Sequence, residues 1–211
     1  MYTCAGCAAL ACEDPQHKNM PQNCPIRNEN LNGSTLEKYA TPENKPFFLV
    51  SSEIESIGYG KWPRLKEIIE FCKHMDYSKV GIAFCSGLKK EAKVINSILK
   101  SHGLEVVSVI CKAGGISKER VAVPEKHKLQ PGQYEPMCNP IGQAAFLNEQ
   151  HTQFNIVVGL CVGHDSLFYK YSEAFVTTLI AKDRVLAHNP AGAVYCAEGY
   201  YKKKLAPESE D

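Results

Sequence analysis

Four cysteines at the amino terminus are spaced closely enough to bind one metal ion. Cys4, Cys7, Cys12 and Cys24 follow the pattern C-x2-C-x4-C-x11-C, and Pro25 follows the last of them. A C-x2-C step lets two sulfur atoms bind the same ion, as in zinc sites and some iron–sulfur sites. We therefore expect Zn2+ or an iron–sulfur cluster at these cysteines, since sulfur ligands alone do not separate the two.

Four further cysteines stand at the corners of apolar runs. Cys85, Cys111 and Cys161 each follow a short run of mostly aliphatic residues, and Cys138 comes just before a helix-like segment that starts near Pro140. The carboxyl ends of parallel strands converge on one crevice, which is the usual ligand site of an open α/β sheet. We expect the four thiols to meet there. The alternative is that each is a small buried hydrophobic residue, which free cysteine often is.

Such a crevice is suited to three chemistries. Four thiolates bind a [4Fe–4S] cluster, or three bind it and leave one iron for substrate. Zinc with a bound water is the second possibility. The third needs no metal: Cys161 is the nucleophile, His164 or His188 is the base, and a helix N-terminus stabilises an anion. The candidate catalytic residues are Cys161, His164 and Cys138.

Alternating strands and helices are predicted to hold these corners in place. The apolar runs predict strands at 47–52, 79–84, 105–110, 155–160 and 174–181, and amphipathic patterns predict helices at 63–75, 88–103, 140–150 and 165–173. Short, almost wholly apolar strands between amphipathic helices are typical of a parallel sheet covered on both faces. The sequence therefore predicts a doubly wound, Rossmann-like α/β fold with a mostly parallel sheet. It leaves open whether the loop 112–137 closes over the crevice.

The chain divides into three predicted segments. Residues 1–45 form a cysteine-rich metal-binding segment with too few branched aliphatic residues for a core of its own; residues 46–201 form the α/β domain, and residues 202–211 a frayed tail.

Composition narrows the function classes. With 24 basic and 23 acidic residues the net charge is +1, which argues against nucleic acid or a membrane surface as partner and leaves a small-molecule substrate. The first residues lack the pattern of a signal peptide, so we expect a cytoplasmic protein. In a reducing compartment, ten cysteines indicate metal binding or catalysis rather than disulfides.

Several motifs together resemble one family. The amino-terminal cysteine pattern ending in C-P, with FCSGL, CNPIGQA and VVGLCVGHDSLF, is similar to a family of small uncharacterised cysteine-rich proteins of anaerobic prokaryotes that are generally labelled metal-binding. The resemblance implies metal binding by Cys4, Cys7, Cys12 and Cys24, and no settled reaction.

Three functions compete on these grounds. The first is an enzyme whose crevice holds a cluster or zinc, or uses a bare thiolate, and acts on a small sulfur-containing or electrophilic molecule. The second is a metal carrier or redox-sensing module without turnover. In the third, zinc only holds the amino terminus and the other cysteines are packing.

Overall fold

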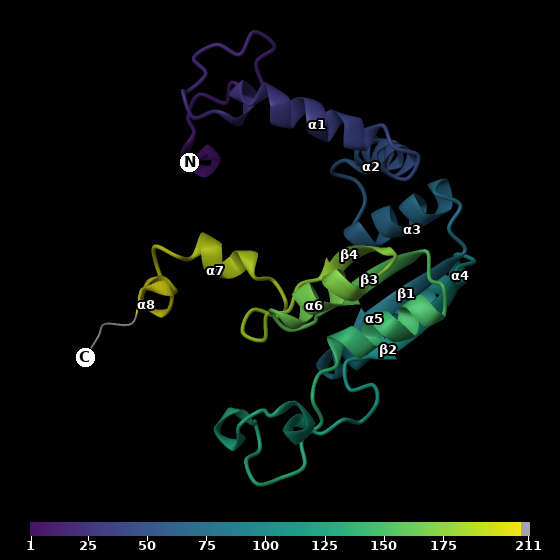
Figure 1. Ribbon diagram of the computed structural model, residues 1–211. Coiled ribbons are helices and arrows are strands. Elements are labelled where there is room, and N and C mark those ends of the chain that lie inside the picture. The colour runs from purple at the N-terminus through teal and green to yellow at the C-terminus, as the bar shows by residue number, and fades with distance from the viewer. Residues whose placement is uncertain (208–211) are drawn as a thin grey trace. The chain divides into compact units, whose positions relative to one another are not determined.

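The computed structural model describes residues 1–207 (Figure 1). The chain forms two compact units, Met1–Ile57 and the part from Gly58 onward. The sequence predicts this boundary at 45/46. The difference comes from residues 46–57, which belong to the first unit and form a helix.

The first unit is helical and has almost no core. Its elements are two 3-10 helices, η1 (Cys4–Gly6) and η2 (Pro25–Arg27), and two α-helices, α1 (Glu29–Tyr39) and α2 (Asn44–Gly58). Within residues 1–57 the buried apolar side chains are those of Ala11 and Ile54. A segment with so little buried apolar surface needs another source of stability, such as a bound metal.

The strand predicted at 47–52 is wrong, because these residues lie inside α2. The apolar run Phe47–Val50 continues into a segment with helical spacing, and a short apolar run does not by itself distinguish a strand from a helix. Pro46 fits in the first turn of the helix, where its missing N–H is not needed. The Ser51 hydroxyl donates to the Phe47 carbonyl one turn back, at 2.8 Å.

The second unit is an α/β domain with a four-stranded, all-parallel sheet, and the predicted fold is confirmed. The strand order is β2-β1-β3-β4, so the two central strands are β1 and β3. Its elements are α3 (Arg64–His74), β1 (Lys79–Phe84), η3 (Ser86–Leu88), α4 (Lys89–Ser101), β2 (Glu105–Ile110), η4 (Lys118–Val121), η5 (Glu125–His127), α5 (Pro140–Glu149), β3 (Phe154–Val158), α6 (His164–Tyr171), β4 (Phe175–Ile180), α7 (Ala191–Tyr195) and α8 (Lys202–Leu205).

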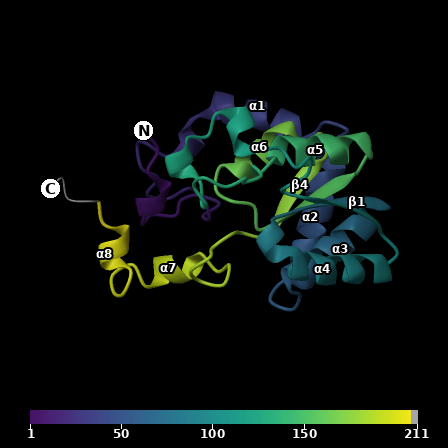
Figure 2. The ribbon, with the colours of Figure 1, turned by 90° about the horizontal axis from the view of Figure 1, so that it is seen from below.

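Helices cover both faces of this sheet, with α5 and α6 on one side and α3 and α4 on the other (Figure 2). Strand β3 is buried along its whole length and β1 is buried except at its two end residues, and Ile82 and Ile156 are fully shielded from solvent. Helix α4 presents Ala92, Ile95 and Leu99 to the core, as its 3.6-residue spacing predicts. The chain turns from β2 back across β1 to β3, and the carboxyl ends of β1 and β3 therefore flank the point where the winding reverses. Ligands bind at such a point in open α/β sheets.

Two further predictions concern the chain's end and membranes. Residues Lys202–Leu205 form the short helix α8, whereas the sequence predicts a frayed tail from 202; the last four residues of that tail lie outside the described residues. Among the helices of residues 1–207, none has the length and apolar character to cross a membrane.

Candidate functional site: a cluster of four thiols

Cys85, Cys111, Cys138 and Cys161 line one hollow at the carboxyl ends of the strands. We call these four residues the thiol cluster. The hollow is too narrow to admit a water molecule, and it is completed by Pro140, Gln143, Leu160 and His164. Four sulfur-bearing residues from distant parts of the chain thus share one small space. The roles that the sequence predicts for them remain predictions.

The sheet itself fixes the first two thiols. The Cys85 amide donates to the Val158 carbonyl of β3 at 3.1 Å, and the Cys111 amide donates to the Phe84 carbonyl of β1 at 2.8 Å. Each cysteine therefore continues the hydrogen-bond ladder one residue beyond its strand. Both are buried, with exposed fractions of 7% for Cys85 and 2% for Cys111.

Cys138 is held against the end of β2 by the residue that follows it. The Asn139 amide N–H donates to the Cys111 carbonyl at 2.7 Å, and the Asn139 side chain accepts from the Gly142 amide at 2.9 Å as the N-cap of α5. Asn139 is therefore a capping residue. Its backbone contact places Cys138 next to Cys111.

Cys161 lies in the turn between β3 and α6. Gly159 begins this turn at φ 65°, and a Cβ there would stand 2.7 Å from the buried Leu88 side chain, so only glycine fits. The Cys161 carbonyl then accepts the amide N–H groups of His164 and Asp165 at 2.9 and 3.0 Å and starts α6. The Cys161 side chain is left half-exposed at the edge of the hollow.

Each sulfur has a donor directed at it. Lys182 donates to Cys85, Arg184 to Cys161 at 3.1 Å, Lys112 to Cys138 at 3.5 Å, and the Ser86 amide to Cys111 at 3.3 Å. Three of the four donors are cations. Cationic groups beside sulfur favour thiolates over thiols. The site is therefore suited to carry negative charge on sulfur.

Two of these thiols have pKa values that are shifted in opposite directions. The pKa of Cys138 is lowered to about 6, first because the Cys111 thiol donates to its thiolate and then because the Lys112 ammonium lies close. The pKa of Cys85 is raised to about 12, first because its thiol donates to Cys111 and then because burial disfavours its charge. The cluster is thus a chain of donors in which Cys85 keeps its proton and Cys138 loses its own near neutral pH.

Gln143 and His164, which line the hollow, each have a buried polar atom with no hydrogen-bond partner among residues 1–207: Gln143 Oε1 and His164 Nδ1. The Gln143 amide nitrogen donates to the carbonyls of Phe84 and Val109 at 3.2 and 2.7 Å, which fixes the oxygen as the free end of a fully buried side chain. Burial lowers the pKa of His164, so its ring is neutral at pH 7. Unpartnered buried polar atoms are costly and mark places where a ligand completes the bonding.

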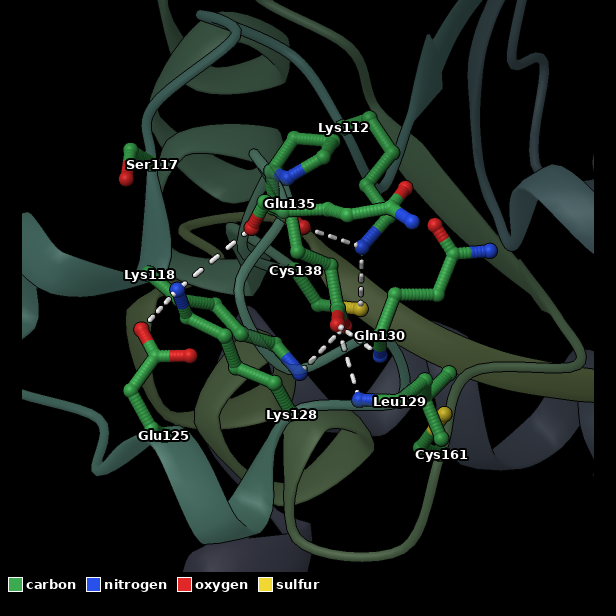
Figure 3. A network of polar contacts seen from close by, with 12 residues as sticks. Lys112, Ser117, Lys118, Glu125, Lys128, Leu129, Gln130, Glu135, Cys138 and Cys161 are labelled. Carbon is green, nitrogen blue, oxygen red and sulfur yellow. Dashed lines mark hydrogen bonds and ion pairs between the residues drawn. The ribbon is translucent and has the colours of Figure 1, made fainter.

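The loop between β2 and α5 is tied together by ion pairs rather than loose (Figure 3). The Lys128 side chain is buried and pairs with Glu119 and Glu125. Glu135 pairs with Lys118 and accepts the Leu129 and Gln130 amides at 2.8 and 3.2 Å. The lysines lower the pKa values of Glu119 and Glu135, and the Gly132 amide N–H, followed by Lys128, lowers the pKa of Glu125.

Lys112 connects this loop to the thiol cluster. Its ammonium donates to the Pro136 carbonyl at 2.6 Å as well as to Cys138, and Figure 3 shows it beside that sulfur. The loop thereby holds its cation in place near the site.

The amino-terminal cysteines are partly gathered. Cys4, Cys7 and Cys24 line one hollow of about 210 Å3, and Cys12 is not among its lining residues. Within residues 1–207, no three side chains of His, Cys, Asp or Glu are arranged as ligands of one metal ion. Three soft sulfur donors around an open hollow nevertheless fit zinc or iron, provided that the segment closes on the ion.

Sequence reasoning reached some of the site and missed the rest. His188 does not line the hollow, and its Nδ1 accepts the Asp183 amide at 3.2 Å. The cations beside the sulfurs are Lys112, Lys182 and Arg184. Each stands just past the end of a predicted strand, and this position was the signal in the sequence that could have identified them. Their pairing with individual sulfurs was not predictable, because it depends on how the strands align.

The fold and these contacts define the class of the molecule: a parallel α/β domain that carries a thiol cluster at the carboxyl ends of its strands and that follows a cysteine-rich amino-terminal segment in the sequence. The chain belongs to the family described as "Protein of unknown function (DUF1847)", whose model matches residues 24–179. The matched region includes all four residues of the thiol cluster and Cys24.

A relative carries the same resemblance across most of the chain. The uncharacterized protein MJ0455 of Methanocaldococcus jannaschii is 55% identical over 170 residues, which cover 81% of this chain and 85% of that protein. The family resemblance expected from the motifs is confirmed. The metal-binding label that came with it remains a prediction.

Proposed function

We propose that this protein is a thiol-dependent enzyme in which Cys138 attacks a small electrophilic molecule at the carboxyl ends of β1, β2 and β3. One observation carries the proposal: four thiols from separate segments line a hollow together with Gln143 and His164, and each of these two residues has a buried polar atom without a hydrogen-bond partner among residues 1–207. Most buried polar atoms in folded proteins have partners, so two unpartnered atoms beside four thiols favour a ligand site over simple packing.

Two neighbours prepare Cys138 for attack. The Cys111 thiol and the Lys112 ammonium stabilise the thiolate, which is the nucleophilic form of cysteine. A pKa near 6 also keeps the sulfur reactive, since the best attacking thiols have pKa values near the ambient pH. These contacts favour Cys138 over Cys161 as the attacking sulfur.

The other polar groups of the site serve the substrate. Because the hollow admits no water in this structure, it must widen when a substrate binds. Gln143 Oε1 then accepts a hydrogen bond from the substrate, and neutral His164 takes up or returns a proton at Nδ1. Arg184, beside Cys161 and exposed, attracts a negatively charged part of the molecule. The substrate is therefore small, polar and electrophilic.

A metal centre in the same hollow is the second candidate function. Its support is that four cysteines line one hollow, since cysteine sulfur is the donor of zinc sites and of [4Fe–4S] clusters; the four side chains would have to rearrange to become ligands of one metal ion. At the amino terminus, we propose that Cys4, Cys7 and Cys24 bind zinc or iron and that Cys12 becomes the fourth ligand when the segment closes. Binding of this kind supplies folding free energy.

Alkylation of protein purified without oxygen tests the main proposal. We expect iodoacetamide at pH 7 to label Cys138 at least a hundredfold faster than Cys72, a buried thiol in α3 whose pKa burial raises to about 12. The reaction is followed by peptide mass spectrometry on the native chain, with the Cys138→Ser variant as control for peptide assignment.

Equal, slow labelling of Cys138 and Cys72 contradicts the thiolate proposal. Metal and acid-labile sulfide content, measured on the same sample, tests the second candidate. If Cys138→Ser removes metal that Cys196→Ser retains, the crevice is a metal centre; Cys196 is an exposed cysteine outside both cysteine sets.

A further inference from the structure

Cys111 and Cys138 are placed as an accessible thiol and a shielded partner. The Asn139 N–H donates to the Cys111 carbonyl at 2.7 Å, which holds the two backbones side by side, and both cysteines line the same narrow hollow. Cys111 is 2% exposed, whereas Cys138 is half-buried and reachable. One sulfur can therefore meet a substrate, and the other can meet only its neighbour.

We propose that Cys138 and Cys111 form a reversible disulfide during the reaction, and that the substrate is a small disulfide. This inference rests on the proposed function and names its substrate class. It uses the two features that a single nucleophile does not need: a second thiol in contact with the first, and donors that stabilise charge on that second sulfur.

In the first step the Cys138 thiolate attacks one sulfur of the substrate R–S–S–R′. The bond between Cys138 and the R-bearing sulfur forms as the substrate S–S bond breaks, and R′S− leaves. Cys111 no longer donates to a thiolate at Cys138, so its proton passes to R′S− and gives R′SH. The products of this step are a mixed disulfide at Cys138 and a thiolate at Cys111.

In the second step the Cys111 thiolate attacks the Cys138 sulfur. The Cys111–Cys138 bond forms, the mixed disulfide breaks, and RS− leaves and takes a proton from water. The substrate gains two electrons, and the protein loses two. An external dithiol restores the starting state by the same exchange chemistry and becomes a disulfide itself.

The remaining contacts of the cluster fit the second step. Negative charge on Cys111 is met by the Ser86 amide at 3.3 Å and by the Cys85 thiol, which donates to it. Cys85 keeps its proton, as its raised pKa shows, so it serves as a donor and not as a competing nucleophile. Cys85 is thus a positioning residue for the Cys111 thiolate.

Oxidised glutathione is the probe for the test. Reduced full-length protein is mixed with it in the absence of oxygen, quenched with iodoacetamide, and mapped by mass spectrometry. In the wild type we expect a linked Cys111–Cys138 peptide and only a transient glutathione adduct. In Cys111→Ser the adduct at Cys138 accumulates at least tenfold, and in Cys138→Ser neither species forms.

The Cys72→Ser variant is the matched control and should behave like the wild type. The wild-type peptide map needs no variant, so the inference can be tested even if Cys111→Ser folds poorly. A linkage between other cysteines, or a stable adduct in the wild type, overturns the disulfide inference. If Cys138 alkylates rapidly but forms no link with Cys111, the inference fails while the proposed function stands; if Cys138 is inert, both fail.

Discussion

The two cysteine sets of this chain are assembled in opposite ways. Cys4, Cys7, Cys12 and Cys24 are close in sequence but lie in a unit with almost no core, and three of them share an open hollow. The thiol cluster draws on residues spread over more than seventy positions, yet all four line one narrow space. Nearness in sequence thus does not ensure a formed site; hydrogen-bonded strands do. We expect the first set to need its ligand in order to close, and the second to be formed without one.

The largest effect expected is the pH dependence of Cys138 alkylation. Because its pKa is lowered to about 6, the thiolate fraction rises about a hundredfold between pH 4 and pH 8, with a midpoint near pH 6. The initial rate with iodoacetamide measures this profile. The same depressed pKa stabilises the fold: the contribution is complete above the unfolded-state value near 9 and is lost as the pH falls toward 6. A midpoint near pH 9 would show that Cys111 and Lys112 do not stabilise the Cys138 thiolate.

Metal affinity at the amino terminus should respond next most strongly. We expect Cys7→Ser to weaken Zn2+ binding by about tenfold to a hundredfold, because it removes one of the sulfurs that line the hollow. Competition against a chromophoric chelator measures the affinity of the full chain. Cys196→Ser is the control. If Cys7→Ser binds Zn2+ as tightly as Cys196→Ser does, the contrast drawn between the two cysteine sets is wrong.

Preassembly of the thiol cluster can be tested at Gly159. The change Gly159→Ala adds a Cβ against the buried Leu88 at a positive φ, and we expect a loss of about 2 kcal/mol, or roughly thirtyfold in the unfolding equilibrium. Gly103→Ala is the matched control, since its φ is also positive but its Cβ would meet open space. Denaturant unfolding measures both. Equal losses would mean that the Leu88 contact does not matter.

Lys112 should have a smaller effect, confined to the cluster. Replacing it with Met removes a charge beside Cys138 and raises the pKa of that thiol, so alkylation at pH 6 should fall about threefold to tenfold. Lys90→Met, on the exposed face of α4, should leave the rate unchanged. Equal rates in both variants would assign the low pKa of Cys138 to Cys111 alone.

The smallest effect concerns the loop 112–137. Backbone N–H groups and the ammonium groups of Lys128 and Lys118 lower the pKa values of Glu119, Glu125 and Glu135. These glutamates therefore contribute to stability above the unfolded-state pKa near 4.5, and the contribution is lost as the pH falls through their pKa values in the folded state. We expect trypsin to cut the loop faster at pH 4 than at pH 7, after correction for the enzyme's own pH dependence. Unchanged cleavage would show that the ion pairs do not hold the loop.

The sequence predicted most of the domain because its strands are unambiguous. The runs at 79–84 and 105–110 are bounded by turn-forming residues and coincide with β1 and β2. The run at 47–52 failed because apolar residues of that length also suit a buried helix. The alternating order then placed the four cysteines at strand ends. It could not show that Lys182 reaches Cys85 or that Gln143 keeps a free oxygen, since both depend on strand register and packing.

The strand order also predicts that backbone amides on the two sides of the thiol cluster exchange with deuterium at different rates. Cys85 and Cys161 follow the central strands β1 and β3, whose amides should exchange with deuterium only when the whole domain unfolds. Cys111 follows the edge strand β2, and Cys138 follows the long loop, where local opening suffices. The two sulfurs proposed to form the reversible disulfide are thus attached to the edge of the sheet, where we expect faster exchange, while the other two follow the central strands, where we expect the slowest exchange.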